Sequence, residues 1–310
     1  VLGKPMKEPQ DVPFEKEGQY LKSDNRNNIS YFLEHNVLLR RFTLSVGVLA
    51  NYNSALNEGI HFYPGIDASY RIGDNFRLYG SWNRALRMPT FTDLYYEGKT
   101  NKGNPDLKPE ESEAFEVGLK YNTYFLRAHI AGFYRKGKNM IDWVKEKPED
   151  IWESQNLTKV DNLGFETNLS LLPRELGNER FFIRKIELGY AFIHQDKDSE
   201  GYISNYALDY LKHKFTAQLS HSIWKGFSAT WYVRWQDRAG SYTKYENLKP
   251  AYEEPYAPYC LVDMKVNWEY QRLNLYAELN NLLNSTYYDL GNIPQPGIWF
   301  KAGFRYSFKY

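Results

Sequence analysis

Apolar and polar residues alternate along most of this chain, in segments of about ten residues that are closed by turn-forming residues. The C-terminal segment is the clearest, because every second position is apolar: Phe300, Ala302, Phe304, Tyr306, Phe308 and Tyr310. Lys301, Gly303, Arg305, Ser307 and Lys309 fill the positions between them. A period of two residues is typical of a β-strand with one apolar and one polar face. The chain is therefore predicted to be all-β.

The pattern predicts about thirteen strands, at 29–39, 42–52, 62–71, 76–86, 112–122, 124–145, 151–172, 185–195, 208–221, 227–238, 258–268, 272–282 and 298–309. Tight turns are expected at 40–41, 73–75, 122–123, 225–226 and 270–271. They alternate with long connections at 53–61, 87–111, 196–207, 239–257 and 283–297. Short periplasmic turns and long extracellular loops are typical of transmembrane antiparallel β-barrels of the outer membrane. Segment 173–184 departs from this pattern, because it is long on the short-turn side.

The strand count also predicts direction. The last strand of such a barrel runs toward the periplasm, so the first of thirteen strands does so too. Residues 1–28, with prolines at 5, 9 and 13, are therefore predicted to be an extracellular loop segment. Complete bacterial single-chain barrels have an even number of strands. Residues 29–310 are thus expected to be the C-terminal portion of a larger barrel.

Composition narrows the possible partners. The 39 basic and 38 acidic residues nearly balance, which gives no electrostatic reason to expect nucleic acid. Aromatic residues reach 17%, and apolar residues are spread in alternation, which fits strands with one face against lipid. Cys260 is the only cysteine, so an internal disulfide is excluded.

A soluble β-sandwich would use similar alternation with its apolar face turned inward. Two features favour the barrel. Strands of ten or more residues are long for soluble sheets. Tryptophans also lie near the expected strand ends, as in an interfacial girdle: Trp82, Trp143, Trp224, Trp235, Trp268 and Trp299. A barrel enzyme and a passive porin are further alternatives. The sequence contains no Gly-x-Ser-x-Gly motif that would support an enzyme, and no enzymatic activity is expected.

Two adjacent motifs carry a family resemblance. An aromatic strand leads into Arg87-Met88-Pro89-Thr90-Phe91-Thr92-Asp93-Leu94-Tyr95, and Gly103-Asn104-Pro105-Asp106-Leu107-Lys108-Pro109-Glu110-Glu111-Ser112 precedes the next strand. Further matches are Asn139–Trp143, Asn162–Glu166, Asn280–Asn284 and the aromatic C-terminal residue Tyr310. From about residue 28 onward, the chain resembles the C-terminal part of TonB-dependent outer-membrane receptors.

This resemblance implies a 22-stranded barrel plugged by an N-terminal domain. The plug and its energy-coupling TonB box are not part of this sequence. The implied partners are outer-membrane lipid, the remaining N-terminal part of the same receptor, TonB acting through the plug, a small-molecule ligand and a surface lipoprotein. The implied function is active import of cobalamin or an iron chelate, without a cofactor. Short loops are more similar to those of vitamin B12 receptors. A haem receptor is an alternative that requires His61 or His194 to face the ligand.

Candidate ligand-binding residues lie in the expected extracellular loops. They are Arg84, Arg87, Phe91, Tyr95, Tyr96, Tyr242, Tyr245, Tyr252, Tyr287 and Tyr288. Arg84 and Arg87 either contact an anionic ligand, clamp the plug through its carboxylates, or pin the 87–111 loop to the barrel rim, and the last interpretation is favoured. The aromatic residues form either a ligand platform or the loop core and interface girdle.

Candidate lumen residues are the charged residues on the polar strand faces. They are Arg77, Glu116, Lys120, Arg127, Lys214, Arg234, Lys265, Glu278, Lys301 and Arg305. No metal site is predicted, because the six histidines lack zinc-ligand spacing. The run Asp196-Lys197-Asp198-Ser199-Glu200 lacks the glycine turn of a calcium loop.

Overall fold

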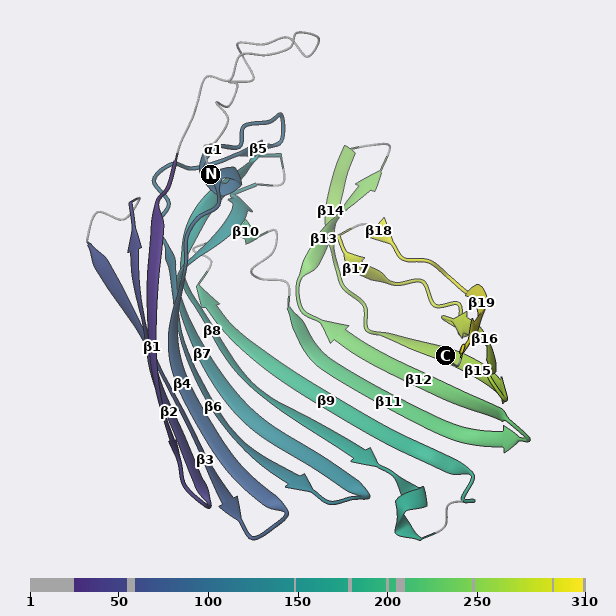
Figure 1. Ribbon diagram of the computed structural model, residues 1–310. Helices are drawn as coiled ribbons and strands as arrows, with labels where there is room; N and C mark the ends of the chain where they lie inside the picture. Colours follow the sequence, from purple (N-terminus) through teal and green to yellow (C-terminus); the bar gives the residue numbers. More distant parts are fainter. Residues whose placement is uncertain are drawn as a thin grey trace.

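Thirteen long strands form one continuous antiparallel path in the computed structural model, which describes residues 25–54, 59–147, 149–177, 180–198, 201–204, 210–246, 249–291 and 293–308 (Figure 1). The strands of this path are β1 (Asn28–Leu38), β2 (Phe42–Asn53), β3 (Ile60–Ile72), β4 (Phe76–Arg87), β6 (Glu110–Asn122), β7 (Leu126–Lys145), β8 (Trp152–Leu171), β9 (Ile183–Asp198), β11 (Leu211–Trp224), β12 (Phe227–Arg238), β15 (Tyr259–Tyr270), β16 (Leu273–Asn280) and β19 (Trp299–Tyr306). All thirteen predicted strands are confirmed, with boundaries that differ by a few residues.

Each strand of the path pairs with its neighbours in sequence, so the sheet is a simple up-and-down meander. Figure 1 shows that it curves into a trough with β1 and β19 at its two edges. The tight turns begin where the backbone permits them. Gly73, Gly226 and Gln271 have positive φ values of 65°, 88° and 51°, and glycine takes this conformation without steric cost.

The register separates the two faces of the sheet. Trp231 lies opposite Met264, which lies opposite Leu279, which lies opposite Phe300. At the neighbouring position of each strand, the residues that lie opposite one another are Thr230, Lys265, Glu278 and Lys301. We call these two surfaces the outward face and the lumen face.

The outward face stays uncovered although it is apolar. Phe115, Leu188 and Phe304 are 44%, 40% and 73% exposed. The one buried cluster of the described residues is small, with Val144, Leu157 and Val160 at its centre. A soluble sandwich would bury these side chains against a second sheet, so that alternative does not fit. An uncovered apolar face is the surface that a lipid bilayer covers.

Several short elements lie in the connections and were not predicted. They are α1 (Phe91–Tyr95), β5 (Asn101–Lys102), the 3₁₀ helix η1 (Pro173–Leu176), β10 (Ile203–Ser204), β13 (Ser241–Glu246), β14 (Lys249–Pro255), β17 (Tyr288–Leu290) and β18 (Ile293–Pro294). Most of these segments contain too few positions to display a period of hydrophobicity, and the sequences of β13 and β14 do not alternate. Helix η1 occupies the long connection on the short-turn side.

One of the six expected girdle tryptophans is corrected. Trp299 lies opposite Asn280, which places it in a lumen-face position of β19. Trp143 lies beyond Asn139, whose positive φ of 53° interrupts the alternation of β7. Trp143 packs edge-on against Tyr96 of the 87–111 loop. Trp82, Trp224, Trp235 and Trp268 do take outward positions. A residue near a strand end can face either side of the sheet, depending on whether its position is odd or even. Proximity to the end therefore does not determine the face.

Three remaining points concern the ends and the membrane. Residues 1–24 of the predicted extracellular segment 1–28 lie outside the described residues. Cys260 lies opposite Trp235 on the outward face. Within the described ranges, no helix has the length and apolar character needed to cross a membrane.

We predict opposite tolerances for two adjacent residues of β19. Phe304 is in an outward position and Arg305 is in a lumen position. Phe304→Arg should destabilise the folded barrel by about 2–4 kcal/mol, because it places a charge in hydrocarbon, whereas Arg305→Ala should be mild. Denaturant titration of folding into lipid vesicles measures both. Equal losses would contradict the assigned faces.

Candidate ligand-binding loops and lumen

The 87–111 loop is anchored by one carboxylate. Arg87 Nε and Nη2 each donate to Glu110 at 2.6 Å, and the Glu110 side chain is only 8% exposed. Glu110 Oε1 also accepts from the backbone N–H of Ile141 at 2.8 Å. A bidentate Arg–carboxylate pair fixes both distance and direction. The arrangement supports the interpretation that this motif pins the loop to the rim.

The same motif starts helix α1. Thr90 accepts from the backbone N–H of Asp93 at 3.1 Å, and Asp93 accepts from the N–H of Thr90 at 2.9 Å. This reciprocal capping box satisfies two helix-terminal donors. Arg87 Nη1 lies 3.9 Å from Asp93. Residues of the motif therefore bind one another, and every guanidinium nitrogen of Arg87 lies within 3.9 Å of a carboxylate oxygen.

Arg84 points to the other side of the sheet. It lies opposite Glu113 on the outward face and pairs with Glu111 at 2.7 Å. Arg84 and Arg87 are three positions apart, and an odd separation along a strand puts two side chains on opposite faces. A contact of Arg84 with a ligand in the lumen is therefore not supported by its direction.

The aromatic residues of the 87–111 loop pack against their surroundings. Phe91 and Tyr95 stack with ring centres 6.3 Å apart. The guanidinium of Arg26 lies 4.7 Å from the Phe91 ring centre and donates to Pro89 O at 2.6 Å. Tyr96 meets Trp143 edge-on at 6.2 Å and keeps 45% of its surface exposed. Of these rings, Tyr96 is the most available to a ligand.

A tyrosine cluster joins the last two long connections. Tyr242 of β13 lies 5.1 Å from Tyr288 of β17 and 5.2 Å from Tyr256, measured between ring centres. Tyr242 and Tyr256 are only 7% and 8% exposed. The Tyr256 hydroxyl accepts from the N–H of Gly291 at 3.0 Å. These rings are the core of a two-loop unit, and Tyr242 has little surface left for a ligand.

The remaining loop tyrosines differ in availability. Tyr287 packs 4.7 Å from Tyr259, whose hydroxyl bonds to Gln236 and Asp289. Tyr245 and Tyr252 are each 53% exposed on the β13–β14 hairpin. The exposed ligand candidates are thus Tyr96, Tyr245 and Tyr252.

An ion pair and cation–π contacts of Lys244 stabilise the β13–β14 hairpin. Lys244 Nζ lies 2.7 Å from Glu254 and lies over the rings of Tyr242 and Tyr288, at 5.8 and 5.9 Å. The hydrogen bond from Lys244 lowers the pKa of the Glu254 carboxyl. Burial, followed by the hydrogen bond to Glu254, raises the pKa of Tyr242.

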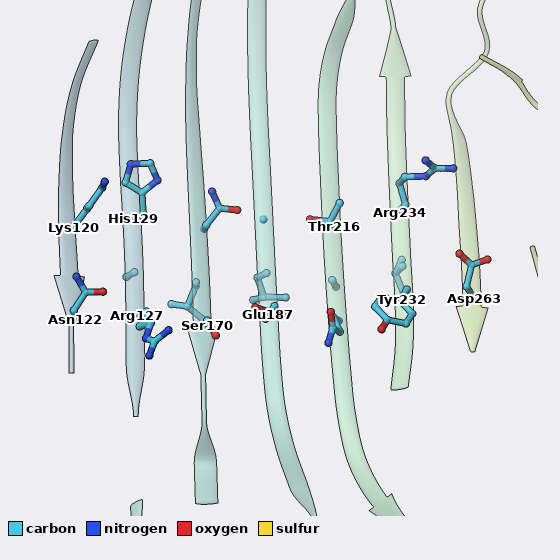
Figure 2. A pocket seen from close by; sticks show the side chains of 18 residues that line it. Lys120, Asn122, Arg127, His129, Ser170, Glu187, Thr216, Tyr232, Arg234 and Asp263 are labelled. Carbon is cyan, nitrogen blue, oxygen red and sulfur yellow. The ribbon is translucent and has the colours of Figure 1, made fainter. Parts of the chain in front are cut away.

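The ten lumen candidates all occupy lumen-face positions, as the register indicates for Arg77, opposite Lys120, and for Lys214, opposite Gln236. Three of them, Lys120, Arg127 and Arg234, line a hollow of about 620 Å³ in the middle of the sheet (Figure 2). Glu187, Thr216 and Asp263 line it too and were not among the candidates. The alternation of polar and apolar strand positions, which identified the candidates, could also have identified these three residues.

A second hollow of about 910 Å³ lies near the tight turns of β11 to β19. Glu278 pairs there with Lys265 at 2.7 Å and also with Lys301. Arg305 is part of the lining, together with Arg184, Lys185 and Arg272, which sequence reasoning missed. Basic residues thus outnumber acidic ones in this region.

A polar network that the sequence did not reveal crosses β4, β6 and β7. The Tyr79 hydroxyl lies 2.7 Å from both Glu116 Oε1 and His129 Nε2, and the two rings stack with centres 5.9 Å apart. His129 Nδ1 lies 3.8 Å from Glu166. The register brings together residues that are 37 to 50 positions apart in sequence.

The two histidines considered for haem are not placed alike. His61 lies opposite Asn51 in a lumen position of β3, whereas His194 lies opposite Leu163 on the outward face. Among the residues that the structure describes, no group of three or more His, Cys, Asp or Glu side chains is placed to hold a metal ion.

The comparisons with known proteins agree with this geometry. The family described as TonB dependent receptor-like, beta-barrel, matches residues 7–282. The chain belongs to this family, and its location is the bacterial outer membrane.

Individual relatives are more distant. The vitamin B12 transporter BtuB of Vibrio vulnificus is 27% identical over 225 residues, covering 54% of this chain and 36% of the relative. The ferrienterobactin receptor of Escherichia coli is 22% identical over 297 residues, covering 86% of this chain and 38% of the relative. The chain therefore spans little more than a third of these relatives. Both are named as transporters or receptors.

Solved structures show the same fold. A ferric enterobactin receptor mutant of Pseudomonas aeruginosa in complex with enterobactin matches with a TM-score of 0.73 at 20% identity, covering 94% of this chain and 47% of that one. The copper transporter OprC matches with a TM-score of 0.70 at 16% identity, covering 91% and 48%.

We predict that Glu110→Ala loosens the 87–111 loop. The change leaves the buried N–H of Ile141 without its acceptor and frees Arg87, which should cost about 1–3 kcal/mol. Hydrogen exchange across residues 88–109 measures the loss. Glu111→Ala is the matched control, because its exposed pair with Arg84 should contribute only about 0–1 kcal/mol. If both variants behave alike, Glu110 is not the anchor.

We predict that the tyrosine cluster weakens at both extremes of pH. Glu254 has a lowered pKa in the folded protein. Its contribution to stability is therefore present above its ordinary pKa of 4.5 and is lost as pH falls through the folded pKa. Tyr242 has a raised pKa, so its contribution is lost as pH rises beyond the ordinary 10.0. Hydrogen exchange of residues 239–257 against pH measures both limbs. Glu254→Gln should flatten the acid limb, and an unchanged acid limb would reject this assignment.

Proposed function

We propose that the protein is a TonB-dependent importer of a scarce nutrient, in which this chain forms barrel wall and extracellular loops. The observation that carries the proposal is the two-faced sheet of the family's fold. Its outward face is apolar and uncovered, and its lumen face holds charged hollows of about 620 and 910 Å³. Such a wall separates lipid from a hydrated interior.

The proposal includes the parts beyond this sheet. We infer that residues 29–310 are the C-terminal portion of a barrel of about twenty-two strands, with residues 1–28 in an extracellular connection. The N-terminal part of the same receptor supplies the remaining strands, the plug and the contact with TonB. The match to 47% of a solved receptor chain supports this division.

The proposed cargo is cobalamin or an iron chelate. The relatives include a vitamin B12 transporter and a ferrienterobactin receptor, one for each class. The extracellular loops offer Tyr96, Tyr245 and Tyr252 as exposed aromatic contacts. Haem is an alternative cargo through His61, which takes a lumen position, whereas His194 faces outward. A surface lipoprotein that covers these loops is part of the same family-based proposal.

A passive porin is the second candidate, because a wall with a polar lumen also suits an open pore. The two functions differ in their energy requirement. A porin passes small solutes down a gradient, whereas an importer needs energy relayed from the inner membrane.

Uptake measurements test the function. Cells that express the complete receptor are offered labelled cobalamin, ferric siderophores and haem, with and without TonB. We expect saturable accumulation of cobalamin or one ferric chelate that disappears without TonB. Uptake that persists without TonB and rises linearly with concentration would indicate a porin and overturn the proposal.

A matched pair of variants connects uptake to the loops. Tyr245→Ala and Tyr252→Ala remove exposed rings and should raise the concentration needed for half-maximal uptake. Tyr124→Ala removes an exposed ring beside a short turn and should leave uptake unchanged. Receptor abundance in the outer membrane is measured for each variant.

A further inference from the structure

Charged residues begin abruptly on the outward face of β4 to β9. One row across these strands consists of Trp82, Phe115, Tyr134, Leu163 and His194. The next row toward the long connections consists of Arg84, Glu113, Lys136, Asp161 and Asp196. Glu111, Lys138 and Lys159 follow in the row after that. The step from rings to charges occurs within a single row.

The abrupt step locates the edge of the hydrocarbon. Aromatic residues of membrane barrels gather where the hydrocarbon meets the headgroups, and charges on the lipid face are tolerated beyond that level. The charged rows lie on the side of the long connections, which is the extracellular side. They are therefore level with the headgroups of the outer leaflet.

Most charges in these rows have partners, but among the described residues Glu113, Lys136 and Lys138 form no ion pair. Arg84 pairs with Glu111 at 2.7 Å, and Lys159 pairs with Asp196 at 2.9 Å. The Tyr134 hydroxyl donates to Asp161 at 2.9 Å. Lys136 and Lys138 are exposed, and neither forms an ion pair with another described residue.

The unpaired lysines border a small hollow. It measures about 90 Å³ and is lined by Arg84, Glu111, Ser112, Glu113, Lys136 and Lys138. This is about three times the ~30 Å³ that one water molecule occupies in the liquid, enough for a phosphate group. Arg84 neutralises Glu111, so Lys136 and Lys138 outweigh Glu113 by one positive charge.

We propose that this hollow binds a phosphate group of the phosphorylated glycolipid, lipopolysaccharide, in the outer leaflet. Lys136 and Lys138 donate charge-assisted hydrogen bonds to the phosphate oxygens, and the acyl chains lie along the row of Trp82 and Phe115. The site fixes the lipid that surrounds the barrel and is independent of the cargo in the lumen. It would remain even if the transport proposal failed.

The test uses the complete receptor extracted from outer membranes in mild detergent. Native mass spectrometry measures its binding of lipid A with both phosphates, of dephosphorylated lipid A and of phosphatidylglycerol. Wild type should bind phosphorylated lipid A at least about tenfold more tightly than the other two, as expected from lost charge-assisted hydrogen bonds. Equal binding of phosphorylated and dephosphorylated lipid A would overturn the proposal. Equal binding of phosphatidylglycerol would overturn the assignment to glycolipid.

Charge variants identify the site. Lys136→Glu/Lys138→Glu should lose the preference for phosphorylated lipid A, and Lys136→Arg/Lys138→Arg should keep it. The control Lys99→Glu/Lys147→Glu makes the same charge change at two exposed loop positions and should bind like wild type. Heat-dependent migration in gels verifies that each barrel is folded, and Lys136→Gln/Lys138→Gln replaces the glutamate variant if that one misfolds. Equal loss in the loop control would reject this location.

Discussion

Backbone hydrogen bonding in a medium without water constrains everything else in this protein. Inside hydrocarbon, each N–H and C=O group must find a partner within the protein, and an antiparallel sheet supplies one for every residue of its inner strands. The thirteen-strand path does this from β2 to β16, and only β1 and β19 have one neighbour each. Edge strands in lipid require further strands, so the same constraint drives closure into a barrel.

Once the backbone is paired, the alternation of side chains along each strand gives the two faces of the sheet different surroundings. Outward positions bring rings and aliphatic chains to lipid, and lumen positions bring charges to the interior, where Glu278 pairs with Lys265 and Lys301. The loops follow a different logic. The Arg87–Glu110 pair and the Tyr242 cluster hold the long connections against the rim by local packing and ion pairs. Candidate ligand contacts are thus the rings that this packing leaves exposed.

Parity also explains where sequence reasoning failed. Counting positions from a strong strand such as 298–309 gave the faces of Phe304 and Arg305 correctly. The same count was not applied to Trp299, which was assigned by its proximity to a strand end and lies in a lumen position. Arg84 and Arg87 were grouped because they are close in sequence, although three positions along a strand separate them onto opposite faces. The charged hollow beside Lys136 and Lys138 needed the register of three strands, β4, β6 and β7.

The sequence by itself determined the class of fold, the number of long strands, the alternation of short and long connections and the family motifs. These features are local, because a two-residue period and a turn residue act within about ten positions. Tertiary structure decided which distant residues meet, such as Tyr79 with His129 and Tyr242 with Tyr288, and which loop rings stay exposed. Register between strands and packing between loops set these contacts, and both depend on residues tens of positions apart.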